Sequence, residues 1–224
     1  MFKQKRLTPL TKSGSIMENS KKSKKVKGID PNFDYQKYWE ERYKKGQNSG
    51  AGSYGSNADF KAQHVNKIID KYQCVDMVDY GCGDGNQLSL FTPIPYMGLD
   101  VSATIIRKNE EKYKNDRLKK FGCLNMKENV FELPSADLVT CLDVLFHVCK
   151  EEDWLKLIDM ICNSILKVGV IITNTEEIEE EYFPHVNFKR KILPVLSLRD
   201  DVVIDEVITQ HTHPESNIII LRKV

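Results

Sequence analysis

The sequence predicts an α/β protein with a mostly parallel sheet and helices on both faces of that sheet. Short apolar runs alternate with longer segments of helical periodicity, which is typical of parallel sheets. A glycine-rich segment directly follows the first apolar run, at the sheet edge where such folds bind ligands. The chain has 224 residues, 41% of them hydrophobic, so it can bury a substantial core, and no stretch approaches the roughly 18 apolar residues of a membrane span.

The expected elements follow one another in a regular order. Two lead-in helices are expected at residues 34–45 and 57–72, where apolar and aromatic residues recur at helical spacing. After them we expect a strand at 77–80, a helix around 87–91, a strand at 96–99, a helix from Ser102 as N-cap to about Lys114, strands near 121–124 and at 137–142, a helix at 152–166 and a strand at 168–173. Two β-rich runs, 202–209 and 217–221, flank a polar stretch too short for a helix, which predicts an antiparallel hairpin at the sheet edge.

The segment after the first strand combines an acid with three glycines in the pattern Asp79-x-Gly81-x-Gly83-x-Gly85. Glycines at these positions let the backbone turn sharply and approach a ligand that a Cβ would obstruct. The pattern differs from the dinucleotide fingerprint G-x-G-x-x-G, which directs a helix N-terminus at a pyrophosphate. An acid at this strand end repels a phosphate but attracts a cationic group. The alternative is a glycine turn that binds nothing.

A second acid strengthens the prediction of a ligand. Asp100 lies 21 residues after Asp79, at the end of the second apolar run. In doubly wound sheets a carboxylate at this place accepts hydrogen bonds from ribose hydroxyls. The two features together predict a cofactor that contains adenosine.

These residues resemble the first two motifs of the class I S-adenosylmethionine-dependent methyltransferases. The resemblance implies a Rossmann-like sheet of seven strands, in which an antiparallel strand is inserted near the C-terminus. It also implies that the cofactor is S-adenosylmethionine. The residues expected to bind this cofactor are Asp79, Gly81, Cys82, Gly83, Asp84, Gly85, Asn86, Asp100 and Val101.

Further segments resemble a small methyltransferase group associated with surface-glycan genes in bacteria and large DNA viruses, which includes rhamnose O-methyltransferase-like proteins of viruses. The matching segments are 38–43, 48–55, 60–62, 83–89, 142–147 and 184–186. This resemblance implies methyl transfer to a sugar hydroxyl of a glycan or its activated precursor.

Residues 46–56 contain four glycines and three serines between two expected helices, so the segment looks too flexible for a packed element. It is either a mobile lid over the cofactor, with Tyr54 contributing its ring or hydroxyl, or an ordinary exposed linker. Lys61 follows this loop. It could contact the cofactor carboxylate, but a solvated helix face is the favoured interpretation.

His147, just past the fourth expected strand, is the leading candidate for a general base, because a hydroxyl acceptor is a weak nucleophile and imidazole has an ordinary pKa near 6.5. A structural histidine is the alternative. Phe146 stands where the wider superfamily commonly has a glutamate. Asp143 could orient His147, line the acceptor pocket or cap the next helix. His185 could contact the acceptor, or it is a plain loop residue.

The charge of the chain is unevenly distributed. Residues 1–30 carry nine Lys or Arg against two acids; since the whole chain carries +1, the remainder carries about −6. We expect residues 1–30 to be a disordered basic leader, with a nuclear-localisation or nucleic-acid patch as the alternative, and 31–224 to be a single domain. The negative balance of that domain argues against binding to long nucleic acid.

The six cysteines include no C-x-x-C pair and sit mostly in apolar runs, so they predict small buried side chains in a reduced compartment such as the cytoplasm. We expect no metal site, because His211 and His213 have a thin ligand set around them. Three functions remain: an O-methyltransferase acting on a small-molecule or glycan acceptor, an RNA or protein methyltransferase, and a non-catalytic cofactor-binding subunit. The oligomeric state stays open.

Overall fold

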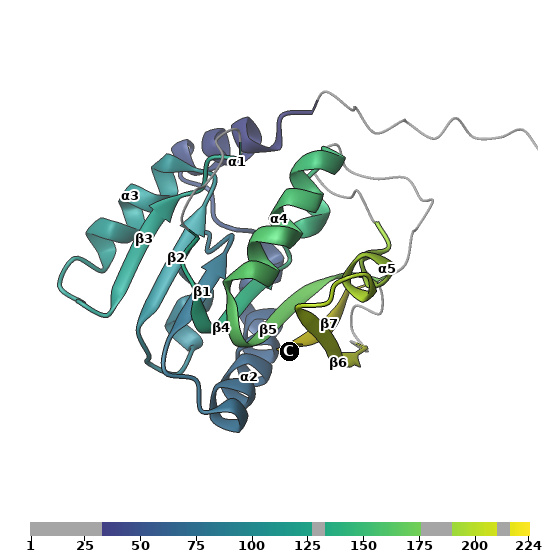
Figure 1. Cartoon of the computed structure of the whole chain (residues 1–224). Helices are drawn as coiled ribbons and strands as arrows, with labels where there is room; N and C mark the ends of the chain where they lie inside the picture. The colour runs from purple at the N-terminus through teal and green to yellow at the C-terminus, as the bar shows by residue number, and fades with distance from the viewer. Residues whose placement is uncertain (1–32, 127–132, 176–189, 210–215) are drawn as a thin grey trace, which may run out of the picture.

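The computed structural model describes residues 33–126, 133–175, 190–209 and 216–224. Its centre is a seven-stranded sheet with strand order β3-β2-β1-β4-β5-β7-β6 (Figure 1). The strands are β1 (Met77–Tyr80), β2 (Tyr96–Asp100), β3 (Lys119–Cys123), β4 (Ala136–Leu142), β5 (Ile165–Asn174), β6 (Val202–Ile208) and β7 (Ser216–Lys223). The predicted elements therefore form the predicted sheet.

Strand direction divides the sheet into two parts. The strands from β3 to β5 run parallel to their neighbours, whereas β7 is antiparallel to both β5 and β6. The terminal hairpin and the inserted antiparallel strand are thus confirmed. Because β1, β2 and β4 are parallel, their carboxyl ends meet at one edge, and α1 (Tyr35–Lys44) lies across that edge (Figure 1).

The remaining helices are α2 (Gly55–Tyr72), α3 (Ala103–Lys112), α4 (Glu151–Ser164) and α5 (Ile192–Ser197), with 3₁₀ turns η1 (Ala51–Ser53), η2 (Gln87–Leu90) and η3 (Leu145–His147). The helix expected around 87–91 is only the 3₁₀ turn η2. The sequence did not predict α5, because its six residues are nearly all apolar and too few to show a helical period.

Two helices of the site region begin at side-chain caps. The Asp34 carboxylate accepts a hydrogen bond from the Lys37 N–H at 2.9 Å, and the Ser102 hydroxyl accepts one from the Ile105 N–H at 3.2 Å. The predicted N-cap of α3 is therefore confirmed. Such caps typically stabilise a helix by about 1 kcal/mol.

The sheet is covered on both faces. One apolar cluster joins α4 and α5 to β4 and β5, and a second joins α2 to the opposite face. Side chains alternate along β1, so Val78 and Tyr80 face α4, whereas Met77 packs in the cluster of α2. Asp79 points to the same face of the sheet as Met77, towards α2.

Five of the six cysteines are buried, but Cys123 is exposed. Its strand, β3, lies at the edge of the sheet, so the expectation of a buried side chain is wrong there. In the part of the chain that the structure describes, no helix is long and apolar enough to cross a membrane. The basic segment 1–30, His185, His211 and His213 lie outside the described residues.

Candidate functional site

The glycine loop after β1 needs glycine for two reasons. Gly81, Gly83 and Gly85 all have positive φ, at 83°, 54° and 69°. A Cβ on Gly81 would overlap the side chain of Val144, and one on Gly83 would overlap the hydroxyl of Ser49. The loop therefore packs closely against segments that follow β4 and α1.

Asp100, at the end of β2, points its carboxylate back at this loop. It accepts hydrogen bonds from the backbone N–H of Gly83 at 3.0 Å and of Ser102 at 2.9 Å. Its exposed fraction is 7%. Burial raises the pKa of Asp100 to about 6; the two backbone hydrogen bonds lower the pKa, and the negative charges of Asp79 and Asp84 raise it further. A carboxylate offers about four acceptor positions, so this one retains room for two hydroxyl donors.

Asp79 lies on the α2 face of β1 and is almost fully buried. Its oxygens accept hydrogen bonds from the Tyr96 hydroxyl at 2.8 Å and from the Thr140 hydroxyl at 2.6 Å. Burial raises the pKa of this carboxyl, an effect that these hydrogen bonds and Lys61 oppose. The acid is thus built into the sheet beside the glycine loop.

A cavity of about 290 Å³ opens where the loops after β1, β2 and β4 converge. Gly81, Gly83, Asp100 and Val101 line it from the first two loops, and residues 142–144 and 146–148 line it from the third. The loop 46–56 and α1 complete the wall. The ends of β1, β2 and β4 therefore converge on one cavity.

Sequence patterns alone did not predict the α1 wall. Tyr35, Tyr38, Trp39, Arg42 and Tyr43 all line the cavity. Their spacing of three, four, seven and eight residues from the first is the spacing of one helix face, which was the available signal. The wall meets the β4 loop where the ring of Trp39 contacts that of His147 edge-on, with centroids 5.1 Å apart.

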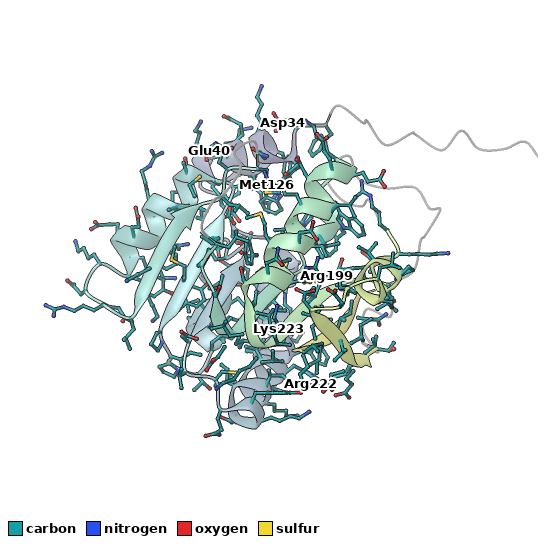
Figure 2. All side chains as sticks on the ribbon, in the orientation of Figure 1. Asp34, Glu40, Met126, Arg199, Arg222 and Lys223 are labelled. Carbon is teal, nitrogen blue, oxygen red and sulfur yellow. The ribbon has the colours of Figure 1, made fainter. Side chains whose placement is uncertain are left out.

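A carboxylate on the outer side of α1 fixes this helix to α3. Glu40 accepts hydrogen bonds from the Ser102 hydroxyl at 2.6 Å and from the Thr104 hydroxyl and N–H at 2.7 and 3.1 Å. Burial raises its pKa, but the hydrogen bonds from Ser102 and Thr104 and the charge of Lys44 prevail and lower it to about 2. Figure 2 labels Glu40 on α1, and Met126, another lining residue of the cavity, lies nearer α4.

The loop 46–56 is packed, contrary to the sequence-based expectation of a segment too flexible to pack. Asp84 holds it: its carboxylate accepts from the Ser49 N–H at 2.8 Å and from the Tyr54 hydroxyl at 2.9 Å, and its own N–H donates to the Ser49 hydroxyl at 2.9 Å. The Asn86 amide donates to the carbonyl of Ser53 at 2.6 Å. These hydrogen bonds join residues that are 30 to 35 positions apart in the sequence, so composition does not reveal that the loop is packed.

His147 ends η3 and lines the cavity beside Phe146, and the His147 N–H donates to the Val144 carbonyl at 2.9 Å. Asp143 also lines the cavity, but it does not cap a helix, since η3 begins after Val144 and has no side-chain cap. Instead the Asp143 carboxylate accepts from the ammonium of Lys61 at 2.8 Å and from the hydroxyl of Ser216 at 3.3 Å. The helix-cap interpretation of Asp143 is therefore wrong.

The solvated interpretation of Lys61 is also wrong, because this residue is only 3% exposed. Position 61 falls within the buried stripe of α2 formed by Ala58, Ala62 and Val65. The helical period of that stripe was visible in the sequence, but the lysine was assigned to the opposite face.

Comparison with known proteins agrees with this geometry. Residues 78–173, which contain the glycine loop, Asp100 and His147, match a family model described as a methyltransferase domain. Residues 78–173 thus resemble a methyltransferase domain, and the seven-stranded sheet around them has the Rossmann-like methyltransferase fold. No curated protein is similar enough in sequence to match the chain.

Solved structures share the fold of this methyltransferase domain at low sequence identity. The N-methyltransferase NodS from Bradyrhizobium japonicum, in complex with S-adenosylhomocysteine, has a TM-score of 0.61 and 13% identity over 85% of this chain and 99% of that one. Magnesium protoporphyrin IX methyltransferase from Synechocystis, with bound S-adenosylmethionine, has a TM-score of 0.56 and 15% identity over 86% and 98%. A [4+2]-cyclase, SpnF, has a TM-score of 0.59 and 13% identity over 79% and 84%. The fold alone therefore does not define the reaction.

Proposed function

We propose that this methyltransferase moves a methyl group from S-adenosylmethionine to a sugar hydroxyl of a glycan or of its activated precursor. One observation carries the proposal: the glycine loop, the Asp100 carboxylate and His147 all line the same cavity of about 290 Å³. A hydrogen-bond acceptor for the ribose and a candidate base thus face the same cavity.

The residues of the motif fit the cofactor. The Asp100 carboxylate is positioned by two backbone N–H groups and can accept hydrogen bonds from two ribose hydroxyls. Val101 borders the same part of the cavity, and Gly81 and Gly83 present bare backbone to it. In this proposal Cys82, Asp84, Gly85 and Asn86 shape the loop, and Tyr54 acts indirectly by holding Asp84.

S-adenosylmethionine supplies an electrophilic methyl group on a sulfonium that is already a good leaving group, so orientation of the acceptor contributes much of the catalysis. His147 accepts the proton of the attacking hydroxyl at an imidazole nitrogen. Trp39 restrains the imidazole through its edge-on ring contact. Asp143 places a negative charge on the same cavity wall as His147 and is held there by its ion pair with Lys61. His185 remains a candidate contact for the acceptor.

The acceptor preference rests on the aromatic wall that α1 contributes to the cavity. Tyr38 and Trp39 offer flat, amphipathic rings, and the guanidinium of Arg42 lies 5.7 Å from the Trp39 ring centroid. Apolar rings with a few placed polar donors suit a sugar, which has apolar C–H faces and a hydroxyl rim. The resemblance of segments 38–43 and 142–147 to glycan-modifying methyltransferases supports the same class.

The test is mass spectrometry of products after the protein is incubated with S-adenosylmethionine and a panel of nucleotide sugars, methyl-free oligosaccharides, short RNAs and peptides. A gain of one methyl group on a sugar, absent with Asp100→Ala, is the expected result. Transfer to RNA or peptide alone would replace this proposal by the second function considered above. Binding of the cofactor without transfer to any acceptor would favour the non-catalytic one.

A further inference from the structure

Arg42 differs from the other charged residues of the main cavity. Among the residues that the structure describes there, it is the one lysine or arginine in the wall. Asp100 accepts hydrogen bonds from two backbone N–H groups, and Asp143 is paired with Lys61. The guanidinium of Arg42 thus adds a positive charge to a cavity whose two carboxylates already have partners.

The hydrogen bonds of Arg42 orient its side chain without neutralising its charge. Its Nε donates to the Asn48 carbonyl at 2.7 Å, and its Nη1 donates to the Tyr38 hydroxyl at 3.3 Å. Both acceptors are neutral, and in the described part of the chain Arg42 forms no ion pair. A guanidinium has five N–H groups, so three remain for a ligand.

The outer nitrogen of this guanidinium lies at the cavity. Nη2 of Arg42 is 3.9 Å from the place where a Cβ of Gly50 would stand, and Gly50 also lines the cavity. Other partly buried arginines of the described chain use this nitrogen internally: Arg199 pairs with two aspartates, and Arg190 donates from both Nη atoms to backbone carbonyls. Nη2 of Arg42 has no such acceptor among the described residues, so it is available to an anion.

Trp39 connects Arg42 to the candidate base. The guanidinium carbon lies 5.7 Å from the centroid of the Trp39 ring, and the ring centroid of His147 lies 5.1 Å from that of Trp39. The guanidinium and the imidazole are therefore no further apart than these two distances together. A sugar with one charged substituent can span that separation with a hydrogen bond at each end. Because a general base must lie beside the acceptor, Arg42 is also within reach of it.

Building on the proposed function, we infer that Arg42 binds an oxyanion of the acceptor, so that the sugar to be methylated is an anionic one: a sugar phosphate, a nucleotide sugar or a uronic acid. The parallel N–H donors of a guanidinium match the oxygens of phosphate and carboxylate. Residues 31–224 carry a charge of about −6, and a domain of that charge repels anions in general. A cation inside the cavity therefore selects anionic sugars over neutral ones at this site.

The experiment measures binding to the full chain saturated with S-adenosylhomocysteine. The probes are glucose 1-phosphate and the methyl glycosides of glucuronic acid and of glucose, which carry a phosphate, a carboxylate and no charge. Calorimetric affinities are compared for the wild type, Arg42→Gln and Arg42→Lys. Lys37→Gln, which removes one positive charge from an exposed position of α1, is the matched control.

The wild type should bind at least one charged probe roughly 10- to 100-fold more tightly than methyl glucoside, because hydrogen bonds to charged groups are the stronger ones. Arg42→Gln should abolish this preference and change the affinity for methyl glucoside less than about twofold. Arg42→Lys should keep part of the preference, since it retains the charge without the planar fork, and Lys37→Gln should keep all of it. Preference for the phosphate alone indicates an activated sugar, and preference for the carboxylate alone indicates a uronic acid.

Equal affinity of the wild type for charged and neutral probes, or no binding of any of them, would overturn the inference. A preference that survives in Arg42→Gln would assign it to another group. The wild type also gives a measurement that needs no variant: the preference should shrink as the salt concentration rises from about 0.05 to 0.5 M. A preference that is independent of salt would rule out an ionic contact even if Arg42→Gln does not fold.

The carboxylate of the cofactor is the competing anion for Arg42. S-adenosylhomocysteine carries that carboxylate, whereas methylthioadenosine lacks the whole amino-acid end, and Arg42→Gln should bind both as the wild type does. Selective weakening of S-adenosylhomocysteine would assign Arg42 to the cofactor, and equal weakening of both would assign it to the structure of the wall; either result contradicts the inference. The probes report binding and not transfer, so a failure of sugars as methyl acceptors, which rejects the proposed function, is distinguishable from a failure here.

Discussion

At the residue scale, Asp100 is the residue on which the proposed cofactor site depends most. Its carboxylate is the group in the cavity that two backbone N–H groups orient, and its burial makes the charged form less favourable. Asp100→Ala should leave two ribose hydroxyls without their acceptor and weaken the binding of S-adenosylhomocysteine by roughly 1.5–3 kcal/mol. Calorimetric titration checks this, and an unchanged affinity would remove Asp100 from the cofactor site.

The same residue gives binding a pH dependence with a definite sign. Burial raises the pKa of Asp100 to about 6, so the carboxyl is charged above that pH and protonated below it. A carboxylate is the better acceptor for two hydroxyls, and affinity for S-adenosylhomocysteine should therefore fall as the pH decreases from about 7.5 to 5. The decrease should flatten in Asp100→Ala. A variant that keeps the full pH dependence would assign it to another group.

His147 is tested by separating turnover from binding. If it accepts the hydroxyl proton, His147→Ala should lower kcat by roughly 10²- to 10⁴-fold, while S-adenosylhomocysteine binds as before. A structural role through Trp39 would instead lower the melting temperature and weaken binding together, because that ring contact joins α1 to the β4 loop. Wild-type turnover in the variant would leave Asp143, His185 or proximity to account for the reaction.

At the element scale, α1 and the loop 46–56 form one side of the site, and Glu40 joins α1 to α3. Glu40→Gln removes the charge from three accepted hydrogen bonds. Amide hydrogen exchange across α1 and residues 46–56 should therefore become faster, with exchange in β5 unchanged. Exchange that rises equally everywhere would instead indicate a global loss of stability.

The stabilisation of α1 by Glu40 depends on pH, because the fold lowers the pKa of this residue. Its pKa falls from 4.5 to about 2, so the stabilisation is complete above about 4.5 and is lost as the pH falls towards 2. The difference in α1 exchange between the wild type and Glu40→Gln should thus be largest near pH 6 and smaller near pH 3.

The sequence predicted the elements whose pattern is local. β1, β2, β4 and β5 are apolar runs, and the glycine loop and the cap at Ser102 are short motifs whose geometry the residues themselves impose. The missed features depend on contacts between distant residues. Lys61 and Asp143 are 82 positions apart, and Ser49 and Asp84 are 35 apart, so no local pattern reveals either pair. Composition suggested a flexible loop and a solvated lysine, but tertiary contacts bury the lysine and pack the loop.

At the scale of the whole molecule, the site is assembled from nearly the full length of the domain. Its parts come from α1, the loop 46–56, three strand ends and the hydroxyl of Ser216 at the start of β7. The two apolar clusters likewise join α2 to β7 and α4 to β6. We therefore propose that residues 31–224 fold as one cooperative unit, and that no shorter piece would retain the cofactor site.

The last prediction tests where that unit begins. Residues 1–30 carry nine basic residues and few apolar ones, so they contribute little surface to a core. Deleting them should leave the melting temperature and the affinity for S-adenosylhomocysteine nearly unchanged, because the first cap of the domain, Asp34, is retained. As a matched comparison, a deletion to residue 45 removes α1 and should abolish binding, since it takes away the Trp39 wall and the Glu40 contact. Loss of the cooperative transition in the shorter deletion would make the basic segment part of the fold.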